Sequence, residues 1–387
     1  MSPSRTLDTL DEAGLRSLLS ELGREAAEFR FRIAPNPCVG AAILSGTREV
    51  ARGFHQVWAG AHAEVQAMAA ARSRGVAAER WDTIVCTLEP CSTDGKTGPC
   101  TRALIDAGLR RVVVGALDPD PRHRGKGLEL LQEAGLETVL LASGSPLEEV
   151  SPHFLDWTAK ERVRRPRPWL IAKWAQTRTG QLTPPKDVGD GRWISGPESL
   201  AEVHERRGRV DAILTGVGTV LKDDPRLTVR PPGNRTSPPL RVVLDTELRT
   251  RPESTLLRPP TSEEEAGGDV WIFCRAGAAP ARHRALEAAG AKVASLRPDS
   301  DGRVSLRAAL EHLWDLGARR VLVEAGPTLQ EALLDAGFVD QVAVYTGSVN
   351  GGRGRSLASR LSPERLLHPD HREVGGDAVL EAFYRNP

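Results

Sequence analysis

Hydrophobic and polar positions along the first half of the chain alternate between helical and strand patterns. Apolar residues recur at helical spacing over residues 13–31, and Val39–Leu44 is a short apolar run after a Pro-Asn-Pro turn, which predicts a strand. Glu49–Phe54 is the predicted hairpin partner of that strand. Further helices are expected over 63–74, 101–108 and 127–134, and further strands over 83–88, 111–115 and 137–141. This order predicts an α/β domain.

The second half repeats the alternation after a basic, proline-punctuated stretch at Lys160–Pro168, which is typical of a solvated linker and less often of a binding patch. Five strands are expected over 169–174, 212–215, 240–245, 270–274 and 320–324, and helices over 198–206, 282–289 and 307–316. Residues 249–269, rich in Pro, Ser and Glu, predict an exposed loop. We therefore expect α/β domains at 1–148 and 168–387, joined by a basic linker at 149–167.

Composition argues against several functional classes. A net charge of +1 with 27% charged residues gives no reason to expect nucleic acid or an anionic membrane as a general partner. This composition does not exclude local basic pockets that bind phosphate. The N-terminus lacks the apolar core of a signal peptide, and no apolar run of about 18 residues predicts a membrane span. Five cysteines, an odd number, do not suggest a disulfide framework. We expect a cytoplasmic protein whose thiols are free to bind a metal.

Candidate metal chemistry lies in two short segments. One is His62-Ala63-Glu64, and the other contains Cys91 and Cys100. One imidazole and two thiolates suit tetrahedral zinc with a fourth position left for water, whose pKa zinc lowers to roughly 7. Glu64 is not needed as a ligand, so it is predicted to carry a proton from that water to a leaving amine. The combination predicts a zinc-dependent deaminase that acts on an amino-pyrimidine.

The expected local structure supports this prediction. His62 and Glu64 would open one helix and Cys100 another, and the positive ends of two helices favour thiolates. Taken singly, His-Ala-Glu is usual on surface helices, and the cysteine spacing is wider than in many deaminases. A structural zinc module would have no use for Glu64, and a deaminase that edits nucleic acid would carry a basic stripe with interleaved aromatic residues. Cys38 and Cys274 are expected to be small buried residues.

Several longer strings recur in a fixed order along the chain. In the first half they are Pro35-Asn36-Pro37-Cys38-Val39-Gly40, Gly53-Phe54-His55, His62-Ala63-Glu64-Val65, Thr87-Leu88-Glu89-Pro90-Cys91-Ser92, Gly95-Lys96-Thr97, Pro99-Cys100 and Asp118-Pro119-Asp120-Pro121. In the second half they are Trp193-Ile194-Ser195-Gly196, Gly218-Thr219-Val220-Leu221-Lys222-Asp223-Asp224-Pro225, Leu227-Thr228-Val229-Arg230 and Leu322-Val323-Glu324-Ala325-Gly326-Pro327-Thr328-Leu329. Together these strings resemble the bifunctional riboflavin-biosynthesis deaminase/reductase family, RibD, over roughly residues 25–345.

The resemblance implies a cytidine-deaminase-like domain followed by a dihydrofolate-reductase-like domain, with one zinc ion and NADPH as cofactors. The first domain would hydrolyse the C2 amino group of 2,5-diamino-6-ribosylamino-4(3H)-pyrimidinone 5′-phosphate and release ammonia. The second would use NADPH to reduce the ribosyl chain to a ribityl chain. The resemblance also suggests a homo-oligomer. No Gly-x-Gly-x-x-Gly string follows the first strand of either half, so the cofactor prediction comes from the resemblance.

The same resemblance implies roles for individual residues beside the zinc ligands and Glu64. In the deaminase, the implied substrate contacts are Asn36, His55 and Lys96. In the reductase, the implied substrate contacts are Lys173, Arg207, Leu227, Arg230 and Glu324. The implied cofactor contacts are Trp193, Thr219, Asp223, Gly326, Pro327 and Thr328.

Several departures from the family pattern bear on activity, and Gly191 and Gly347-Ser348-Val349-Asn350 are two of them. Thr93 stands where the family often has a histidine, and Asp120 replaces an asparagine. Thr177-Arg178-Thr179-Gly180 stands where the family usually has Ser-Leu-Asp-Gly, close to the expected hydride-transfer site. The alternative to a bifunctional enzyme is therefore a deaminase whose second domain is reductase-like but not catalytic.

Overall fold

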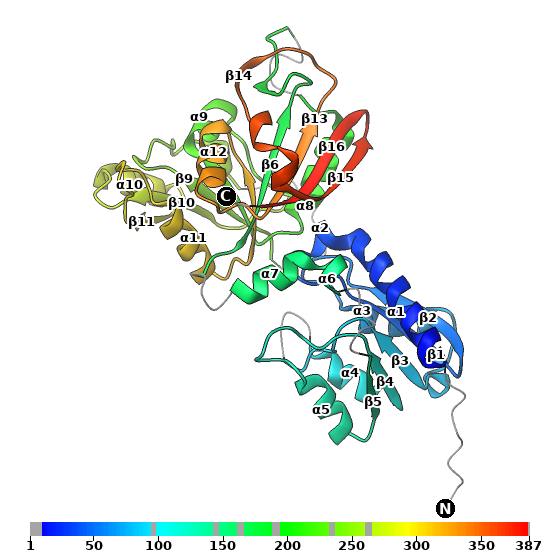
Figure 1. Cartoon of the computed structure of the whole chain (residues 1–387). Coiled ribbons are helices and arrows are strands. Elements are labelled where there is room, and N and C mark those ends of the chain that lie inside the picture. Colours follow the sequence, from blue (N-terminus) through cyan, green and yellow to red (C-terminus); the bar gives the residue numbers. More distant parts are fainter. Residues whose placement is uncertain are drawn as a thin grey trace, which may run out of the picture. The chain divides into compact units, whose positions relative to one another are not determined.

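The computed structural model describes residues 10–93, 98–141, 147–160, 166–187, 194–231, 237–259 and 265–385. Two units, residues 1–164 and 165–387, each enclose a main sheet of their own (Figure 1). Within the described residues, none of the helices combines the length and the apolar character needed to span a membrane. The alternation of helices and strands in both units confirms the predicted α/β class.

The sheet of the first unit has five strands in the order β2-β1-β3-β4-β5. β1 pairs antiparallel with both β2 and β3, whereas β3, β4 and β5 run parallel. The strands are β1 (Gly40–Ser45), β2 (Arg48–Phe54), β3 (Thr83–Cys86), β4 (Arg111–Val114) and β5 (Glu137–Leu140). Each of them overlaps a strand that the apolar runs predict.

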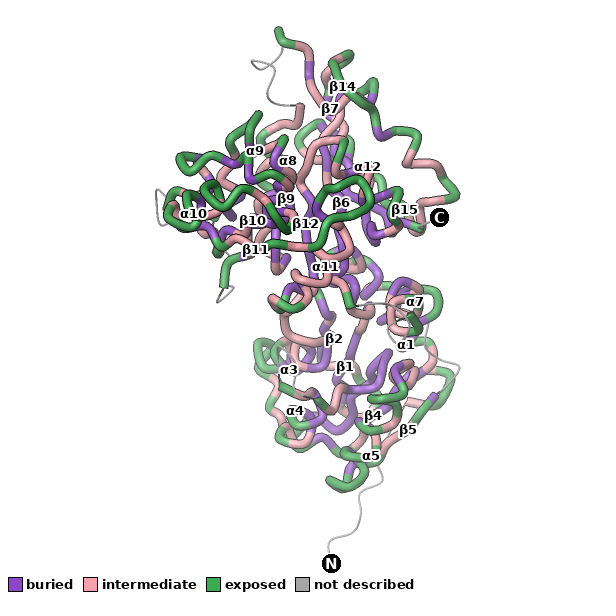
Figure 2. The backbone as a smooth tube through the Cα atoms, turned by 90° about the vertical axis from the view of Figure 1, so that its left-hand side faces the viewer, coloured by how far each residue is buried: buried purple, intermediate pink, exposed green. Residues whose placement is uncertain are grey.

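Alternate residues of these strands face two different layers of helix, as expected for a sheet buried on both sides. Ile43 and Val114 belong to the core that includes α3, α4 and α5, while Leu44 and Val113 belong to the core that includes α1. Figure 2 shows β1 as a buried stretch and α5 as largely exposed. The helices of these layers are α1 (Glu12–Ala26), α3 (Ala63–Ser73), α4 (Cys100–Asp106) and α5 (Lys126–Glu133).

Helix α1 begins at an N-cap, because the Asp11 carboxylate accepts a hydrogen bond from the Gly14 N–H at 2.8 Å. The helix predicted over residues 13–31 is broken after Ala26. Shorter helices follow as η1 (Ala27–Phe29), α2 (Arg30–Ile33) and, after α3, η2 (Ala78–Arg80). The stretch predicted as a basic linker contains α7 (Pro152–Lys160), which follows α6 (Leu147–Val150) and belongs to the first unit.

Gly53 allows α3 to pack directly on β2. A Cβ atom at this position would lie 2.6 Å from the backbone carbon of Gln66, 2.7 Å from the carbonyl oxygen of Ala63, and closer still to the Ala67 nitrogen. Because all three neighbours are backbone atoms, a side chain here would force the helix away from the sheet. The contact therefore fixes the first turn of α3, which carries Glu64, at a set distance from the sheet.

The main sheet of the second unit has nine strands in the order β11-β10-β9-β8-β12-β6-β13-β16-β15. The strands from β11 to β13 in this order run parallel, and β16 and β15 add antiparallel pairs at one edge. These strands are β6 (Trp169–Gln176), β8 (Ala212–Gly216), β9 (Leu240–Leu244), β10 (Val270–Arg275), β11 (Lys292–Leu296), β12 (Arg320–Glu324), β13 (Gln341–Thr346), β15 (Leu366–Val374) and β16 (Asp377–Tyr384).

Helices connect and cover these strands. The longer ones are α8 (Pro197–Arg207), α9 (Val217–Asp223), α10 (Pro280–Ala288), α11 (Leu306–Asp315) and α12 (Pro327–Asp335). Single turns occur as η4 (Thr255–Leu257), η5 (Ala358–Arg360) and η6 (Pro363–Arg365). A separate two-stranded sheet pairs β7 (Gln181–Thr183) with β14 (Arg353–Ser356).

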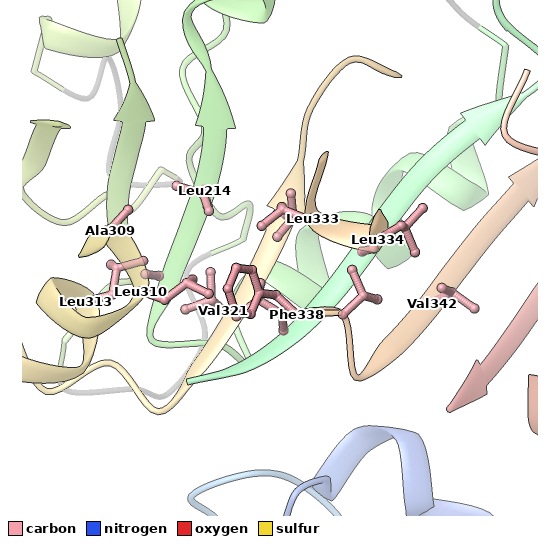
Figure 3. Close-up of a cluster of buried hydrophobic side chains, with 14 of the residues drawn as sticks. Leu214, Ala309, Leu310, Leu313, Val321, Leu333, Leu334, Phe338 and Val342 are labelled. Atoms are coloured by element: carbon pink, nitrogen blue, oxygen red, sulfur yellow. The ribbon is translucent and has the colours of Figure 1, made fainter. Parts of the chain in front are cut away.

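The two faces of the central strands differ in polarity. On one face, Val321 and its neighbours pack with α11, α12 and Phe338 in a continuous apolar core (Figure 3). Successive strand residues point to opposite faces, so the intervening positions of the same strands belong to the other face. Those positions include Lys173 on β6, Glu324 on β12 and Tyr345 on β13. The second unit therefore has one apolar face and one face that holds ionisable side chains.

The segment predicted as an exposed loop over 249–269 is partly buried. Leu256 is fully buried, and its carbonyl oxygen accepts a hydrogen bond from Arg241 Nη1 at 2.6 Å. The prediction of an exposed loop is wrong for this turn. The segment is mostly polar in sequence, but its single turn buries the apolar side chain of Leu256. Residues 260–264 lie outside the described residues.

We predict that Gly53→Ala lowers the free energy of unfolding of the first unit by about 3 kcal/mol, because the added methyl group has only backbone atoms to displace. Chemical unfolding followed by a probe in the first unit measures the change. Gly98→Ala is the matched control, since a Cβ atom there meets nothing within 4 Å. Equal stability of the two variants would show that α3 does not depend on this contact.

Candidate active sites

The three predicted zinc ligands meet at one point of the first unit. His62 is the N-cap of α3, Cys91 lies in the loop after β3, and Cys100 is the first residue of α4. His62 Nδ1 lies 3.6 Å from Cys91 Sγ and 3.4 Å from Cys100 Sγ. One ligand atom from each residue lies within 4.8 Å of the other two. The fold thus brings together ligands that are 29 and 38 residues apart in sequence.

The chemistry of these donors fits zinc. Both cysteines are free thiols, and the Cys100 backbone N–H donates to Cys91 Sγ at 3.2 Å. The side-chain hydrogen bond between the two thiols lowers the pKa of Cys91, with further help from His62, and raises the pKa of Cys100. A thiolate is the form that binds metal. One nitrogen and two sulfur donors, with room for a fourth ligand, are the set expected of a catalytic zinc site.

Glu64 lies beside the ligands and out of water, with a relative exposure of 3%. Burial raises the pKa of its carboxyl group above the ordinary value, although the nearby His62 opposes the shift. A raised pKa makes a carboxyl group a better proton acceptor, while the acid form can still return the proton. The position and environment of Glu64 therefore suit a proton shuttle.

Asn36 and His55, two of the predicted substrate contacts, are hydrogen-bonded to each other. Asn36 Nδ2 lies 3.2 Å from His55 Nε2, and His55 Nδ1 lies 3.1 Å from the Ala61 carbonyl oxygen. The ring of His55 meets the ring of His62 edge to face, with centroids 5.3 Å apart. The structure thus places both residues next to the metal ligands. Lys96, the third predicted contact, lies outside the described residues.

Glu89, which the sequence reasoning did not single out as a site residue, holds the loop that carries Cys91. Its buried carboxylate accepts backbone hydrogen bonds from Asp118 at 3.0 Å, Gly125 at 2.9 Å and Gly127 at 2.8 Å. Gly127 packs so closely that an added Cβ atom would clash with the carbonyl oxygen of the neighbouring Pro90. Glu89 stands in one of the strings that carry the resemblance, but nothing in the sequence indicates which backbone groups it binds.

Asp120, which replaces the family asparagine, is paired rather than free. Its carboxylate accepts a hydrogen bond from Arg122 Nε at 2.8 Å, and this bond lowers the pKa of Asp120 to about 2. Its backbone N–H donates to the Asp118 carboxylate at 2.8 Å. The negative charge introduced by the replacement is therefore balanced within the same turn. Thr93, the other departure in this domain, is exposed.

A cleft of about 1800 Å³ opens in the second unit and collects the residues predicted for the reductase. Its walls come from β6, α8, α9 and the turn between β12 and α12, together with loops at their ends. Trp193 lies outside the described residues. The other predicted residues that line the cleft are Lys173, Arg207, Thr219, Asp223, Leu227, Arg230, Glu324, Gly326, Pro327 and Thr328.

Three charged side chains of the cleft, Lys173, Arg207 and Glu324, lie next to one another. The register of the parallel strands sets Lys173 directly beside Glu324. Arg207 Nε and Nη2 donate to the two oxygens of Glu324 at 2.7 and 2.9 Å. Burial opposes ionisation of Glu324, but Arg207 outweighs it and lowers the pKa of Glu324 to about 2. Burial also lowers the pKa of Lys173, against the attraction of Glu324.

Two residues that the sequence reasoning missed surround this charged group. The Lys173 ammonium lies 5.2 Å from the centre of the Tyr345 ring, whose hydroxyl group donates to Glu202 at 2.6 Å. His204 lines the cleft, and its Nδ1 lies 3.1 Å from the Thr228 carbonyl oxygen. Neither residue stands in a string that carries the resemblance, so no local signal could have identified them.

Backbone turns at two helix N-termini form another part of the cleft. Thr219 lies in the first turn of α9, and its hydroxyl oxygen accepts a hydrogen bond from the Gly326 N–H at 3.2 Å. Gly326 is the N-cap of α12, which begins with Pro327 and Thr328. A helix N-terminus presents unpaired N–H groups and a partial positive charge, which suit a phosphate. The Gly326 N–H already donates a hydrogen bond to Thr219 within the protein.

The Thr177–Gly180 departure forms a hydrogen-bonded turn. Thr177 is buried and its hydroxyl group donates to Gln181 Oε1 at 3.1 Å. Thr179 joins the turn to a distant loop, because its hydroxyl oxygen accepts a hydrogen bond from the Gly351 N–H at 2.9 Å. The two threonines therefore make local hydrogen bonds and are not among the residues that line the cleft.

Fold and sites together define a zinc-dependent deaminase joined to a dihydrofolate-reductase-like reductase domain. The family described as "Cytidine and deoxycytidylate deaminase zinc-binding region" matches residues 16–116, and the "RibD C-terminal domain" matches residues 168–380. The second match alone covers more than half of the chain.

Similar proteins agree with both matches. Riboflavin biosynthesis protein RibD of Aquifex aeolicus is 34% identical over 84% of each chain, and that of Escherichia coli is 32% identical over 91% of this chain and 94% of its own length. A Thermotoga maritima structure, described as a diaminohydroxyphosphoribosylaminopyrimidine deaminase/5-amino-6-(5-phosphoribosylamino)uracil reductase, is 27% identical with a TM-score of 0.64 and covers 96% of this chain and 99% of that one.

The chain belongs to the RibD family. It is a bifunctional enzyme of riboflavin biosynthesis, a deaminase and a reductase, with zinc and NADPH as cofactors. These results confirm the predicted family, fold class, activities and cofactors. The alternative of a reductase-like domain without catalysis is not favoured.

We predict that Glu89→Gln weakens zinc binding roughly tenfold, because an amide group cannot accept all three N–H groups that position the Cys91 loop. Competition with a coloured chelator measures the zinc affinity. Glu133→Gln, an exposed position on α5, is the control. Equal zinc affinity in the two variants would show that Glu89 has no influence on the metal site.

Proposed function

We propose that the two sites act in sequence on one phosphorylated amino-pyrimidine. The first releases ammonia from the C2 amino group of 2,5-diamino-6-ribosylamino-4(3H)-pyrimidinone 5′-phosphate, and the second reduces the ribosyl chain of the product to ribityl. The observation that carries the proposal is the meeting of His62, Cys91 and Cys100 beside the buried Glu64. The description of the Thermotoga maritima relative supports the choice of substrate.

In the deaminase, His62, Cys91 and Cys100 would hold the zinc. Bound zinc makes a water molecule acidic enough to lose a proton near neutral pH. Glu64 accepts that proton and passes it to the departing nitrogen, so that the C–N bond breaks, a C–O bond forms and ammonia leaves. Asn36 and His55 hold the pyrimidinone ring through hydrogen bonds.

In the reductase, bound NADPH would be the source of the hydride that C1′ of the sugar receives. The C1′–O4′ bond breaks as the C–H bond forms, and Lys173 Nζ gives a proton to O4′. Glu324 lies opposite Lys173 in the strand register and attracts its positive charge, and Glu324 is itself held by Arg207. Arg230 and Arg207 bind the substrate phosphate, and Leu227 contacts the substrate. Cofactor contacts come from Trp193, Thr219, Asp223, Gly326, Pro327 and Thr328.

Two further proposals concern the protein as a whole. The five cysteines of the chain are all free, which favours a reducing compartment such as the cytoplasm. The family resemblance favours a homo-oligomer. Sedimentation of the purified protein tests the second point directly, and a single monomeric species would refute it.

The order of the two reactions is tested by supplying the diamino-pyrimidinone phosphate with and without NADPH and identifying the products by mass. Without NADPH, we expect exchange of one amino group for an oxo group and release of ammonia. With NADPH, the product should gain two more hydrogen atoms. Ammonia release that continues at full rate after removal of zinc would overturn the proposed deaminase chemistry.

We predict that Glu64→Gln lowers the deamination rate by roughly 10²- to 10⁴-fold, because the amide cannot carry the proton. The zinc content and the NADPH oxidation rate with deaminated substrate should stay unchanged. Ammonia release, elemental analysis and NADPH absorbance measure the three quantities. A variant that still deaminates at the normal rate would exclude Glu64 as the proton carrier.

We predict that Lys173→Met lowers the NADPH oxidation rate with deaminated substrate by roughly 100-fold, because the proton donor near the sugar is lost. Deamination should be unaffected. Lys292→Met, on the edge strand β11 and paired with Asp269, serves as a control for the loss of a lysine. Normal reduction by Lys173→Met would remove this residue from the mechanism.

A further inference from the structure

The start of α7 reaches back to the loop that carries Asn36. His153 Nε2 lies 3.0 Å from the Asn36 carbonyl oxygen, and Ser151 Oγ accepts a hydrogen bond from the Cys38 N–H at 2.8 Å. Ser151 is fully buried and His153 is 7% exposed. The loop is thus held at two points by residues more than 110 positions later in the sequence, beyond the matched zinc-binding region.

The hydrogen bonds continue from this loop toward the metal ligands. A carbonyl oxygen can only accept, so His55 Nδ1 carries the proton in its bond to Ala61. His55 Nε2 is then an acceptor in the neutral ring and takes the bond from Asn36 Nδ2. By the same reasoning His153 Nε2 donates to the Asn36 carbonyl oxygen. The direction of each bond from α7 to His55 is therefore defined.

We propose that His153 is a positioning residue of the deaminase, which orients the Asn36 amide through the backbone of Asn36. This inference rests on the proposed role of Asn36 and His55 in substrate binding. Removing the donor leaves a carbonyl oxygen unpaired at a part-buried position, which costs free energy, so we expect the backbone at Asn36 to shift. The Asn36 side chain would then lose its alignment with His55, which weakens substrate binding rather than the proton transfer at Glu64.

A series of substitutions at His153 tests the proposal in the full-length, zinc-loaded enzyme. We expect His153→Ala to raise the KM for deamination roughly fivefold with little change in kcat, which corresponds to the loss of one hydrogen bond. His153→Gln should restore the KM, because its amide nitrogen can reach the position of Nε2. His153→Asn, whose amide is shorter, should behave like alanine, and it replaces the alanine variant if that variant does not fold.

Two controls separate positioning from general stability. Lys160→Ala removes an exposed ion pair with Asp156 at the far end of α7 and should leave the KM unchanged. NADPH oxidation with deaminated substrate should be equal in all variants, since their second unit is intact. An equal rise in KM for His153→Gln and His153→Ala would overturn the proposal, because a donor at the right place would then have no effect.

A double-substitution cycle distinguishes this inference from the proposed function. If His153 acts through the Asn36 side chain, His153→Ala should not raise the KM further in an Asn36→Ala background. An unchanged KM in Asn36→Ala alone would refute the substrate role of Asn36. A raised KM in Asn36→Ala with a normal KM in His153→Ala would refute only the role of His153.

Discussion

The removal of ionisable side chains from water is the constraint on which both sites depend. A buried charge is costly unless partners in fixed positions replace the lost hydration. Glu324 meets this requirement through the two-pronged contact with Arg207, and Glu89 meets it through three backbone N–H groups. Each carboxylate joins segments that are distant in sequence, so that the same bonds that offset burial also hold the site together.

The predictable part of the fold is the part whose side chains follow an apolar period. β1 and α3 were expected from short apolar and alanine-rich runs, and they lie where these runs stand. β15 and β16 were not expected, and neither was β13, although the buried Val342, Ala343 and Val344 give it a short apolar run. In β16 the buried Glu381 accepts a hydrogen bond from Arg206, so one of its buried positions is occupied by a polar residue. β15 is a polar strand at the edge of the sheet. A paired ion at a buried position interrupts the apolar pattern of a strand.

The residues of the two sites likewise fall into those that the sequence predicts and those that it does not. The zinc ligands were predictable because metal chemistry restricts the residue types and the sequence keeps them near helix starts. The reductase residues followed from resemblance alone, since Lys173 and Glu324 meet through strand register and not through spacing. Glu89 and His153 escaped notice because their partners lie 29 to 117 residues away. A tertiary hydrogen bond of this kind leaves no trace in a single sequence.

The contrast between the two faces of the nine-stranded sheet has a consequence for how this domain assembles. Neighbouring residues on β12, such as Val323 and Glu324, belong to opposite faces. A slip of a single residue in strand pairing would push a carboxylate into the leucine-rich layer and a valine into the cleft. Both changes would cost free energy. The placement of charged residues on one face of the sheet therefore favours the correct strand register.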